Sequence, residues 1–296
     1  MNRPLLAALP GSGPLAASLC SMIGAEPCDI EVRRFPDGET YLRYITPIAG
    51  RTVILLASLD RPDGKFLPLV FAAATARELG AEHVGLVAPY LPYMRQDRQF
   101  QPGEAVTSAH FARLLSSHVD WVVTVDPHLH RRASLSEVYS IPSEIAHAAP
   151  LMSEWIKRQV EDPLIVGPDS ESAQWVAAVA NAAGAPYVVL EKVRHGDREV
   201  EVTLPGMARW RGRTPVLVDD IVSTARTMIE TLGQLKVAGF AGAACVAVHG
   251  VFAGEAHRNL VDAGATRIAT TNTIPHVTNA IDITKLLAAG ILSLLA

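Results

Sequence analysis

The sequence has few aromatic residues, few cysteines and little net charge, and each shortage narrows what the chain can be. Aromatic residues make up 6% of it against 49% for hydrophobic residues as a whole. Its cores must therefore be built mainly from Ala, Val, Leu and Ile, as in parallel sheets covered by helices. A net charge of −4 gives no general attraction to nucleic acid or to an anionic membrane. Any polyanionic substrate must be held by a local cluster of basic groups.

Cysteine chemistry and membrane insertion are also disfavoured. Cys20, Cys28 and Cys245 follow no metal-ligand or redox spacing and cannot all pair within one chain, so we expect a reducing cytoplasm. The apolar stretch after Arg3 resembles a secretory signal, but the interruption at Gly11 favours a strand, a turn and a helix. No apolar run reaches the roughly 20 residues that a membrane span needs. We therefore expect no membrane and no nucleic acid partner.

Short β-rich apolar runs alternate with helical stretches along the chain, which is the βαβ rhythm of a parallel sheet. The rhythm breaks near residues 142–150, where Pro, Ser and His interrupt it, and then restarts. The sequence thus predicts an α/β protein of two domains, residues 1–145 and 146–296, each a mainly parallel sheet flanked by helices. The expected strands are 53–56, 84–88, 121–125, 164–166, 187–190, 216–218 and 244–248, and the expected helices are 66–79, 106–115, 173–183, 228–237 and 256–261.

A weak internal repeat relates the two halves. Arg51-Thr52 opens one strand, turn and helix, and Arg213-Thr214 opens another. Aligned on these pairs, Ala57-Ser58 falls where Asp219-Asp220 stands in the second copy. The same turn occurs in both halves but carries carboxylates in only one of them, which indicates one sugar-binding domain and one supporting domain. Chance similarity between two βα units is the alternative.

The strongest chemical signal follows the apolar strand that ends at Val218. Asp219 and Asp220 are delivered to the carboxyl end of that strand, where ligands of open α/β sheets bind, and can accept hydrogen bonds from ribose hydroxyls. The small and hydroxyl-bearing residues after them open a helix whose N–H groups suit a phosphate. The alternative is that the acid pair merely caps the helix. The candidate residues for the sugar phosphate are Asp219, Asp220, Ser223, Thr224, Ala225, Arg226 and Thr227.

This stretch resembles the ribose-phosphate signature of the phosphoribosyltransferase superfamily. That pattern reads Asp-Asp, two apolar residues, Asp or Ser, Thr, a small residue, Gly and Thr. Arg226 stands where the pattern usually has Gly. Glycine lets the backbone approach a phosphate closely, so Arg226 either crowds the site or contributes a guanidinium to it.

Further segments, in order along nearly the whole chain, resemble the ribose-phosphate pyrophosphokinase family. They are Phe35-Pro36-Asp37-Gly38-Glu39, Tyr93-Met94-Arg95-Gln96-Asp97-Arg98, Asp126-Pro127-His128, Gly167-Pro168-Asp169, Glu191-Lys192-Val193-Arg194 and Thr271-Asn272-Thr273-Ile274-Pro275. The resemblance implies two tandem phosphoribosyltransferase-like domains and a set of site residues. It implies that ATP is bound by Phe35, Asp37, Glu39, Arg95, Gln96 and His128, that His128 and Asp169 lie at the metal, and that Lys192 and Arg194 are catalytic.

The activity implied is the Mg²⁺-dependent transfer of diphosphate from ATP to the 1-hydroxyl of ribose 5-phosphate, giving phosphoribosyl pyrophosphate and AMP. The loop at Phe35 is expected to complete a neighbouring subunit's nucleotide site, which implies a homo-oligomer of at least two chains. The polar segment 195–199 suits a flap that closes over the reacting phosphates. Two other functions stay open, a phosphoribosyltransferase that consumes phosphoribosyl pyrophosphate and a non-catalytic regulatory paralogue. A zinc pair at His128 and His130 is a further alternative.

Overall fold

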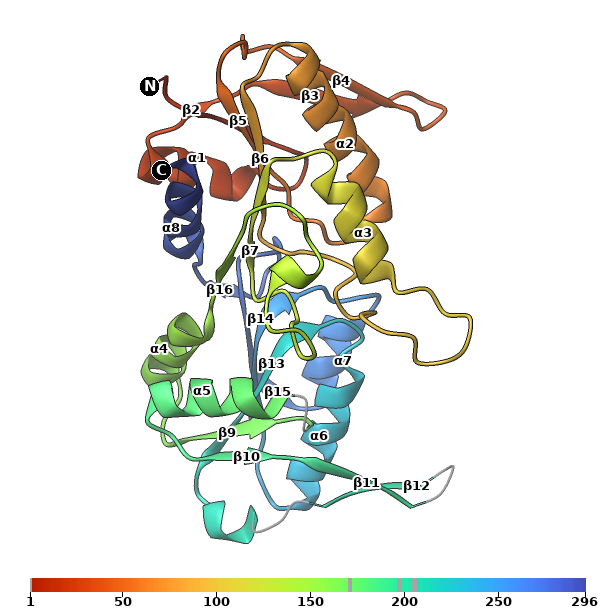
Figure 1. Ribbon diagram of the computed structural model, residues 1–296. Helices are drawn as coiled ribbons and strands as arrows, with labels where there is room; N and C mark the ends of the chain where they lie inside the picture. Colours follow the sequence, from red (N-terminus) through yellow and green to blue (C-terminus); the bar gives the residue numbers. More distant parts are fainter. Residues whose placement is uncertain (1, 170–171, 196–198, 204–206) are drawn as a thin grey trace. The chain divides into compact units, whose positions relative to one another are not determined.

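The structure, a computed structural model, describes residues 2–169, 172–195, 199–203 and 207–296 (Figure 1). The chain divides into two compact units. The first comprises Met1–His147 with Thr273–Pro275 and Ile283–Ala296, and the second comprises Ala148–Asn272 with His276–Asp282. The end of the chain therefore belongs to the first unit. Within the described part of the chain, no helix is both long and apolar enough to cross a membrane.

The first unit is built on a parallel sheet with strand order β2-β1-β5-β6-β7-β8. An antiparallel hairpin, β3–β4, is inserted between β2 and β5 along the chain. The strands are β1 (Leu5–Ala8), β2 (Glu26–Pro27), β3 (Ile30–Arg34), β4 (Thr40–Tyr44), β5 (Thr52–Leu56), β6 (His83–Ala88), β7 (Trp121–Val125) and β8 (Ser143–Ala146). The helices are α1 (Gly13–Ile23), α2 (Asp63–Glu78), α3 (Thr107–Ser116) and the C-terminal α8 (Thr284–Leu295), with a 3-10 turn at Leu135–Glu137.

The second unit repeats this topology with strand order β10-β9-β13-β14-β15-β16, again parallel. The antiparallel hairpin β11–β12 is inserted between β10 and β13, as β3–β4 is in the first unit. The strands are β9 (Pro163–Gly167), β10 (Tyr187–Val189), β11 (Glu191–His195), β12 (Glu199–Thr203), β13 (Thr214–Val222), β14 (Ala243–Gly250), β15 (Ala265–Thr271) and β16 (Asn279–Ile281). The helices are α4 (Ala149–Gln159), α5 (Ala173–Ala183), α6 (Arg226–Val237) and α7 (Ala256–Asp262), with a 3-10 turn at Met207–Trp210.

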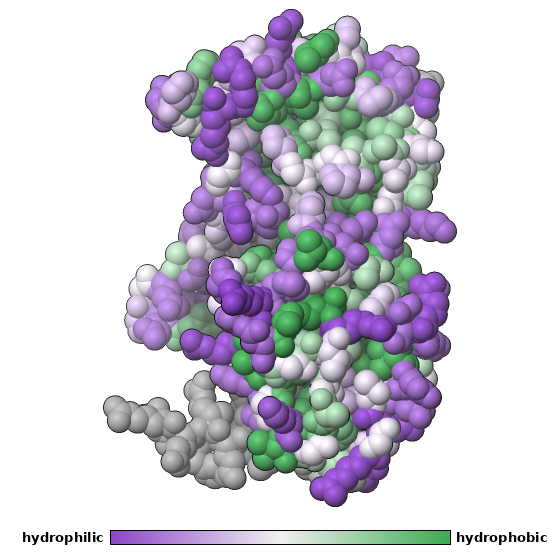
Figure 2. All heavy atoms as spheres, turned by 180° about the vertical axis from the view of Figure 1, so that it is seen from behind, coloured by the Kyte–Doolittle hydropathy of each residue, from purple (hydrophilic) through white to green (hydrophobic). Residues whose placement is uncertain are grey.

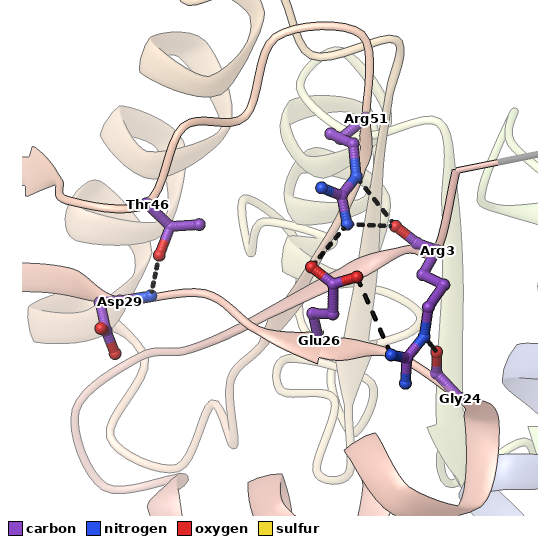
Figure 3. Close-up of polar contacts among 6 residues, drawn as sticks. All are labelled: Arg3, Gly24, Glu26, Asp29, Thr46 and Arg51. Atoms are coloured by element: carbon purple, nitrogen blue, oxygen red, sulfur yellow. Dashed lines mark hydrogen bonds and ion pairs between the residues drawn. The ribbon is translucent and has the colours of Figure 1, made fainter.

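The repeated Arg-Thr pair has the same structural task in both units. Arg51 at the start of β5 donates from Nε and Nη2 to the carbonyl oxygen of Arg3 at 3.0 and 2.6 Å, and forms an ion pair with Glu26 at 3.1 Å (Figure 3). Arg213 at the start of β13 donates to the carbonyl oxygen of Pro163 at 3.3 Å. In each unit the arginine ties the first residues of one central strand to its neighbour, so the repeat reflects a shared architecture.

Edge strand β2 depends on the same network. Arg3 donates from Nε to the carbonyl oxygen of Gly24 at 2.9 Å and approaches Glu26 at 3.9 Å, and these bonds flank the two residues of β2 (Figure 3). Asp29, just beyond β2, donates its backbone N–H to the hydroxyl of Thr46 at 2.9 Å. Because so short a strand has few ladder bonds, these side chains hold its position.

The last helix, α8, packs in the first unit against α1, β7 and β8. Leu287 and Ile291 are fully buried there. Gly290 allows the close approach, because a Cβ at this position would lie 2.9 Å from Cγ1 of Val123 on β7. Helix α8 therefore covers the sheet of the first unit.

The two most exposed large apolar side chains of the described residues come from separate elements. Val237 at the end of α6 is 91% exposed and Val277 before β16 is 87% exposed. Figure 2 shows hydrophobic areas interrupted by hydrophilic residues on the face that it presents. On this face the apolar residues do not form one continuous docking surface.

Candidate functional site

The acid pair lies within the end of β13, although the sequence predicted it in the turn after the strand. Pairing with β9 stops at Leu217, but pairing with β14 continues through Asp219 to Val222. β13 therefore projects beyond β9 and carries the acid pair past its neighbour. Helix α6 begins only at Arg226, its N-cap residue is Ala225, and no side chain caps it. The alternative that the acid pair caps this helix is wrong.

A third carboxylate, that of Asp169, belongs to the same sheet edge. It follows β9 by two residues, and β9 pairs with β13 in parallel. Burial raises the pKa of the Asp219 carboxyl well above its ordinary value, and the charges of Asp220 and Asp169 raise it further. The Asp220 backbone N–H donates to Oδ1 of Asp219 at 2.9 Å, which opposes this rise only in part. The three carboxylates thus lie close enough for the charges of Asp220 and Asp169 to disfavour ionisation of Asp219.

The turn between β13 and α6 has the features of a phosphate loop. Ala225 has left-handed backbone geometry, with φ of 59°, immediately before the helix. Such geometry is costly for a residue with a Cβ and is often retained at binding sites. It directs the chain from Ser223 and Thr224 into the first turn of α6, where Arg226 and Thr227 stand and where N–H groups lack partners within the helix. The predicted sugar-phosphate residues therefore form one continuous segment at the sheet edge.

Lys192 and Arg194 lie on β11, which starts directly after β10. Val189 of β10 pairs with Gly167 of β9, and the backbone N–H of Leu190 donates to the Gly167 carbonyl oxygen at 2.9 Å. The hairpin β11–β12 therefore leaves the sheet at the edge where Asp169 follows β9. The predicted flap includes residues 196–198, which lie outside the described residues.

Phe252 supports the phosphate loop, a role that no pattern in the sequence indicated. Its backbone N–H donates to the carbonyl oxygen of Val222 at 3.0 Å, and that of Ala253 donates to Ser223 at 3.0 Å. Phe252 is buried with a left-handed φ of 41°, and its ring packs against His276 with centroids 4.5 Å apart. Two backbone hydrogen bonds thus tie the segment after β14 to the loop after β13.

The first unit carries the predicted nucleotide residue His128 in a loop after β7. Asp126 and His128 have left-handed φ values of 32° and 57°. The His128 ring contacts His130 edge to face, with centroids 4.1 Å apart and the two ring nitrogens at 3.1 Å. Asp126 accepts a hydrogen bond from Nδ1 of His147 at 3.0 Å, and this contact raises the pKa of His147. The predicted part of His128 in binding ATP and metal stays a prediction.

The loop after β6 joins the His128 loop at the same edge of the first sheet. The Asp97 carboxylate forms an ion pair with Arg131 at 3.1 Å. Gln96 accepts a hydrogen bond from the Thr107 hydroxyl at 2.9 Å, which fixes its amide against the start of α3. Arg95 beside it is exposed. The Asp97–Arg131 ion pair thus joins the two loops that carry the predicted nucleotide residues.

The segment from Phe35 to Glu39 forms the tip of the β3–β4 hairpin, away from those loops along the chain. The Phe35 N–H donates to the carbonyl oxygen of Glu39 at 2.8 Å, and the Glu39 N–H donates to Oδ1 of Asp37 at 3.1 Å. The Phe35 side chain is 40% exposed and contacts Arg33 and Tyr41. An apolar ring held at an exposed tip is available to a partner or ligand.

Comparisons with known proteins agree over most of the chain. A family profile described as the N-terminal domain of ribose phosphate pyrophosphokinase matches residues 5–118, and one for the phosphoribosyl transferase domain matches residues 134–284. The ribose-phosphate pyrophosphokinase of Methanopyrus kandleri is 34% identical over 265 residues, which cover 88% of this chain and 89% of that protein. The corresponding protein of Methanothermobacter thermautotrophicus is 32% identical over 278 residues, covering 94% and 96%. A crystal structure of phosphoribosylpyrophosphate synthetase from Mycobacterium smegmatis shares the fold, with a TM-score of 0.87, 24% identity and 99% of each chain covered.

Two parallel sheets of one topology, with an acid pair and a phosphate loop at the edge of the second, define a tandem phosphoribosyltransferase-type protein. The predicted fold is thereby confirmed. The profiles and the similar full-length relatives are more specific. The chain belongs to the ribose-phosphate pyrophosphokinase family of enzymes, as its motifs indicated.

Proposed function

We propose that this chain transfers diphosphate from ATP to the 1-hydroxyl of ribose 5-phosphate, with Mg²⁺ as cofactor, and releases AMP. The observation that carries the proposal is the end of β13, where the acid pair and the left-handed turn into α6 are consecutive. Carboxylates suit the hydroxyls of a pentose, and the helix N-terminus suits its 5-phosphate. One segment would then hold both ends of the sugar.

The carboxylates of the second unit fit a divalent cation. Mg²⁺ prefers oxygen ligands, and Asp169 offers a carboxylate beside those of the acid pair. A carboxyl whose pKa is raised in the folded state lowers stability as the pH rises from its ordinary pKa to its folded pKa. Asp219 is such a group, so a bound cation would relieve a cost already present at neutral pH. When bound, Mg²⁺ would neutralise charge on the phosphates of ATP.

The reaction forms a bond between the 1-oxygen of ribose 5-phosphate and the β-phosphorus of ATP. It breaks the bond from that phosphorus to the oxygen retained by AMP, and the hydroxyl proton is released. Charge grows on the phosphate oxygens during this step, so positioned cations lower its barrier. Lys192 and Arg194 are the proposed cations, because both belong to a hairpin that starts at the carboxylate edge. Lysine supplies a point charge, and arginine supplies a planar fork of donors.

The nucleotide is proposed to contact Arg95, Gln96 and His128, whose loops are joined in the first unit by the Asp97–Arg131 ion pair. The tip of the β3–β4 hairpin, with Phe35, Asp37 and Glu39, is proposed to complete the nucleotide site of a neighbouring copy. This arrangement makes the active protein a homo-oligomer of at least two chains. The partly exposed Phe35 ring supports this, since an aromatic side chain can stack on a nucleobase.

The deciding assay incubates the purified protein with ATP, ribose 5-phosphate and Mg²⁺ and measures AMP. We expect AMP only when all three are present, and loss of its formation when EDTA removes the metal. Formation of AMP without the sugar would contradict diphosphate transfer to ribose. Consumption of phosphoribosyl pyrophosphate with a nucleobase, without AMP formation from ATP, would favour the phosphoribosyltransferase alternative. No activity in either assay would favour the regulatory paralogue.

Replacing Arg226 by Gly is expected to raise the KM for ribose 5-phosphate roughly tenfold, the scale of one charge-assisted hydrogen bond. The left-handed residue of the turn is Ala225, so the exposed Arg226 is not in a conformation that needs glycine. Arg226 is the first residue of α6, and its guanidinium is proposed to lie beside the phosphate. The matched control is Lys236→Gly in the last turn of α6, which introduces a glycine far from the loop. A lower KM for Arg226→Gly would show that the arginine obstructs the site.

A further inference from the structure

The first unit contains a pocket at the place that corresponds to the sugar-phosphate site of the second. It has a volume of about 280 Å³, and Pro10, Ala57, Ser58, Arg33, Arg34 and Lys65 are among its lining residues. It lies between the ends of β1 and β5, the β3–β4 hairpin and the first turn of α2. The proposed sugar-phosphate site has the equivalent surroundings, at the ends of β9 and β13 beside the β11–β12 hairpin and α6.

Strand register identifies which residues correspond. Aligning the Arg-Thr pairs places Ala57 and Ser58 at the positions of Asp219 and Asp220. Leu5 pairs with Val53 in the first sheet, and Leu164 pairs with Pro215 in the second. Pro10 comes five residues after Leu5, and Asp169 comes five residues after Leu164, so Pro10 occupies the position of Asp169.

All three carboxylates of the second unit are therefore replaced by residues without charge, and all three replacements line the pocket. A divalent cation has lost its ligands there. The hairpin carries basic residues, Arg33 and Arg34 at the end of β3, as β11 carries Lys192 and Arg194. The pocket therefore has cations on its hairpin and none of the three carboxylates.

Lys65, in the first turn of α2, adds a further cation to the pocket. Nζ of Lys65 donates to the carbonyl oxygen of Ser58 at 2.9 Å and forms an ion pair with Asp60. The amine is thereby fixed at the ends of the central strands, 3.9 Å from where a Cβ on Gly11 would lie. Ser58 is itself buried, and its hydroxyl donates to the carbonyl oxygen of Thr273 at 2.6 Å.

Arg34 gives the pocket positive charge. Its Nη2 donates to the carbonyl oxygen of Gly64 at 3.0 Å, which holds the guanidinium at the pocket wall. Arg33 has Glu31 as ion-pair partner and Lys65 has Asp60, but Arg34 has no carboxylate partner among the residues that the structure describes. A guanidinium held by neutral carbonyl groups keeps its full charge and pairs readily with a phosphate.

From this geometry we infer that the pocket is a second anion site, which takes the phosphate group of a phosphorylated metabolite without a divalent cation. Arg34 and Lys65 bind the phosphate oxygens, and the apolar side chains of Leu9, Val32 and Pro68 pack against the rest of the ligand. The site is a copy of the sugar-phosphate site that exchanged metal-dependent recognition for recognition by fixed cations. Phosphate binding at this site does not require the enzyme to turn over.

Lysine acylation followed by mass spectrometry can resolve this site in the intact chain. Besides Lys65, the lysines are Lys157, Lys192, Lys236 and Lys285. With EDTA present and ionic strength matched by chloride, inorganic phosphate is expected to slow acylation of Lys65 severalfold. Lys157, Lys236 and Lys285 serve as internal references whose rates stay constant. Slower acylation of Lys192 would report the proposed active site separately.

Arg34→Ala is expected to abolish the protection of Lys65, whereas Arg43→Ala on β4 of the same hairpin, which does not line the pocket, preserves it. Phosphate affinity measured from the protection curve should fall about tenfold or more in Arg34→Ala. Melting temperature confirms that both variants fold. An unchanged Lys65 rate in the wild type, or equal protection in both variants, would overturn the assignment even if the enzyme makes phosphoribosyl pyrophosphate.

Discussion

Replacing Lys192 by Ala is expected to lower kcat about 100-fold or more, the scale of losing one positioned donor to developing charge. β11 leaves the sheet beside the end of β9, so the strand that carries Lys192 starts at the carboxylate edge. A cation that acts on charge formed during the reaction contributes more to the transition state than to the bound substrates. The KM for ribose 5-phosphate should therefore change much less than kcat. Steady-state AMP formation over a range of both substrates measures the two effects.

Lys236→Ala is the matched control, because Lys236 is an exposed lysine in the last turn of α6, remote from the carboxylate edge. Its kcat should equal that of the unaltered chain. An unchanged kcat in Lys192→Ala would remove this residue from the mechanism. A rise in the KM for ribose 5-phosphate with constant kcat would instead make it a substrate-binding residue.

Gly85→Ala is expected to lower the free energy of unfolding by about 3 kcal/mol or more, at the upper end of overpacking effects. Gly85 on β6 pairs directly with Trp121 on β7, and the indole covers the glycine. A Cβ at this position would lie 2.0 Å from Cζ2 of Trp121, whose side chain is buried. Either the ring or the backbone has to move. Urea unfolding followed by circular dichroism gives the change.

Two further variants separate this clash from a general effect of alanine. Gly233→Ala in α6 should stabilise the protein by up to about 1 kcal/mol, because nothing lies within 4 Å of the added Cβ and alanine favours a helix. Trp121→Leu should make Gly85→Ala cost much less than it does beside the indole, since the two residues are in contact. Equal costs of Gly85→Ala in both backgrounds would contradict the steric explanation.

The central strands and helices could be predicted from the sequence because their signal is local. The expected helix 173–183 coincides with α5, and the expected strand 121–125 coincides with β7. β13 runs farther than its apolar residues indicate, because carboxylates are uncommon in strands and its continuation depends on pairing with β14. Long-range pairing of this kind has no trace in the residues themselves.

The β3–β4 hairpin was not predicted, although a signal for it exists. Ile30 and Val32 alternate with charged residues before the turn, and Leu42 and Tyr44 do so after it, and all four pack against the core of the first unit. Because charged residues separate these four apolar residues, no apolar run marks either strand, and the period of two was missed. The role of Phe252 could not have been predicted, because an aromatic residue in a sequence suggests only a core position. Its left-handed backbone and its bonds to the phosphate loop appear only in the fold.

The family resemblance supplied what patterns could not, namely the predicted roles of Lys192, Arg194 and His128. The geometry adds that Asp169 and the acid pair act on one another's charge at one sheet edge. The pocket beside Lys65, in contrast, could not be predicted from the sequence. Its cations are scattered over the sequence as Arg33, Arg34 and Lys65, and no local spacing marks them as neighbours.

Helix α8 has a consequence for how the chain is made. The strands of the first sheet precede the second unit along the chain, yet the helix that covers α1, β7 and β8 follows that unit. The first sheet must therefore wait, with Val123 on β7 uncovered, until the second unit has been synthesised. A nascent chain stalled before residue 284 would expose this apolar face, and it is the stage at which we expect holding chaperones to bind.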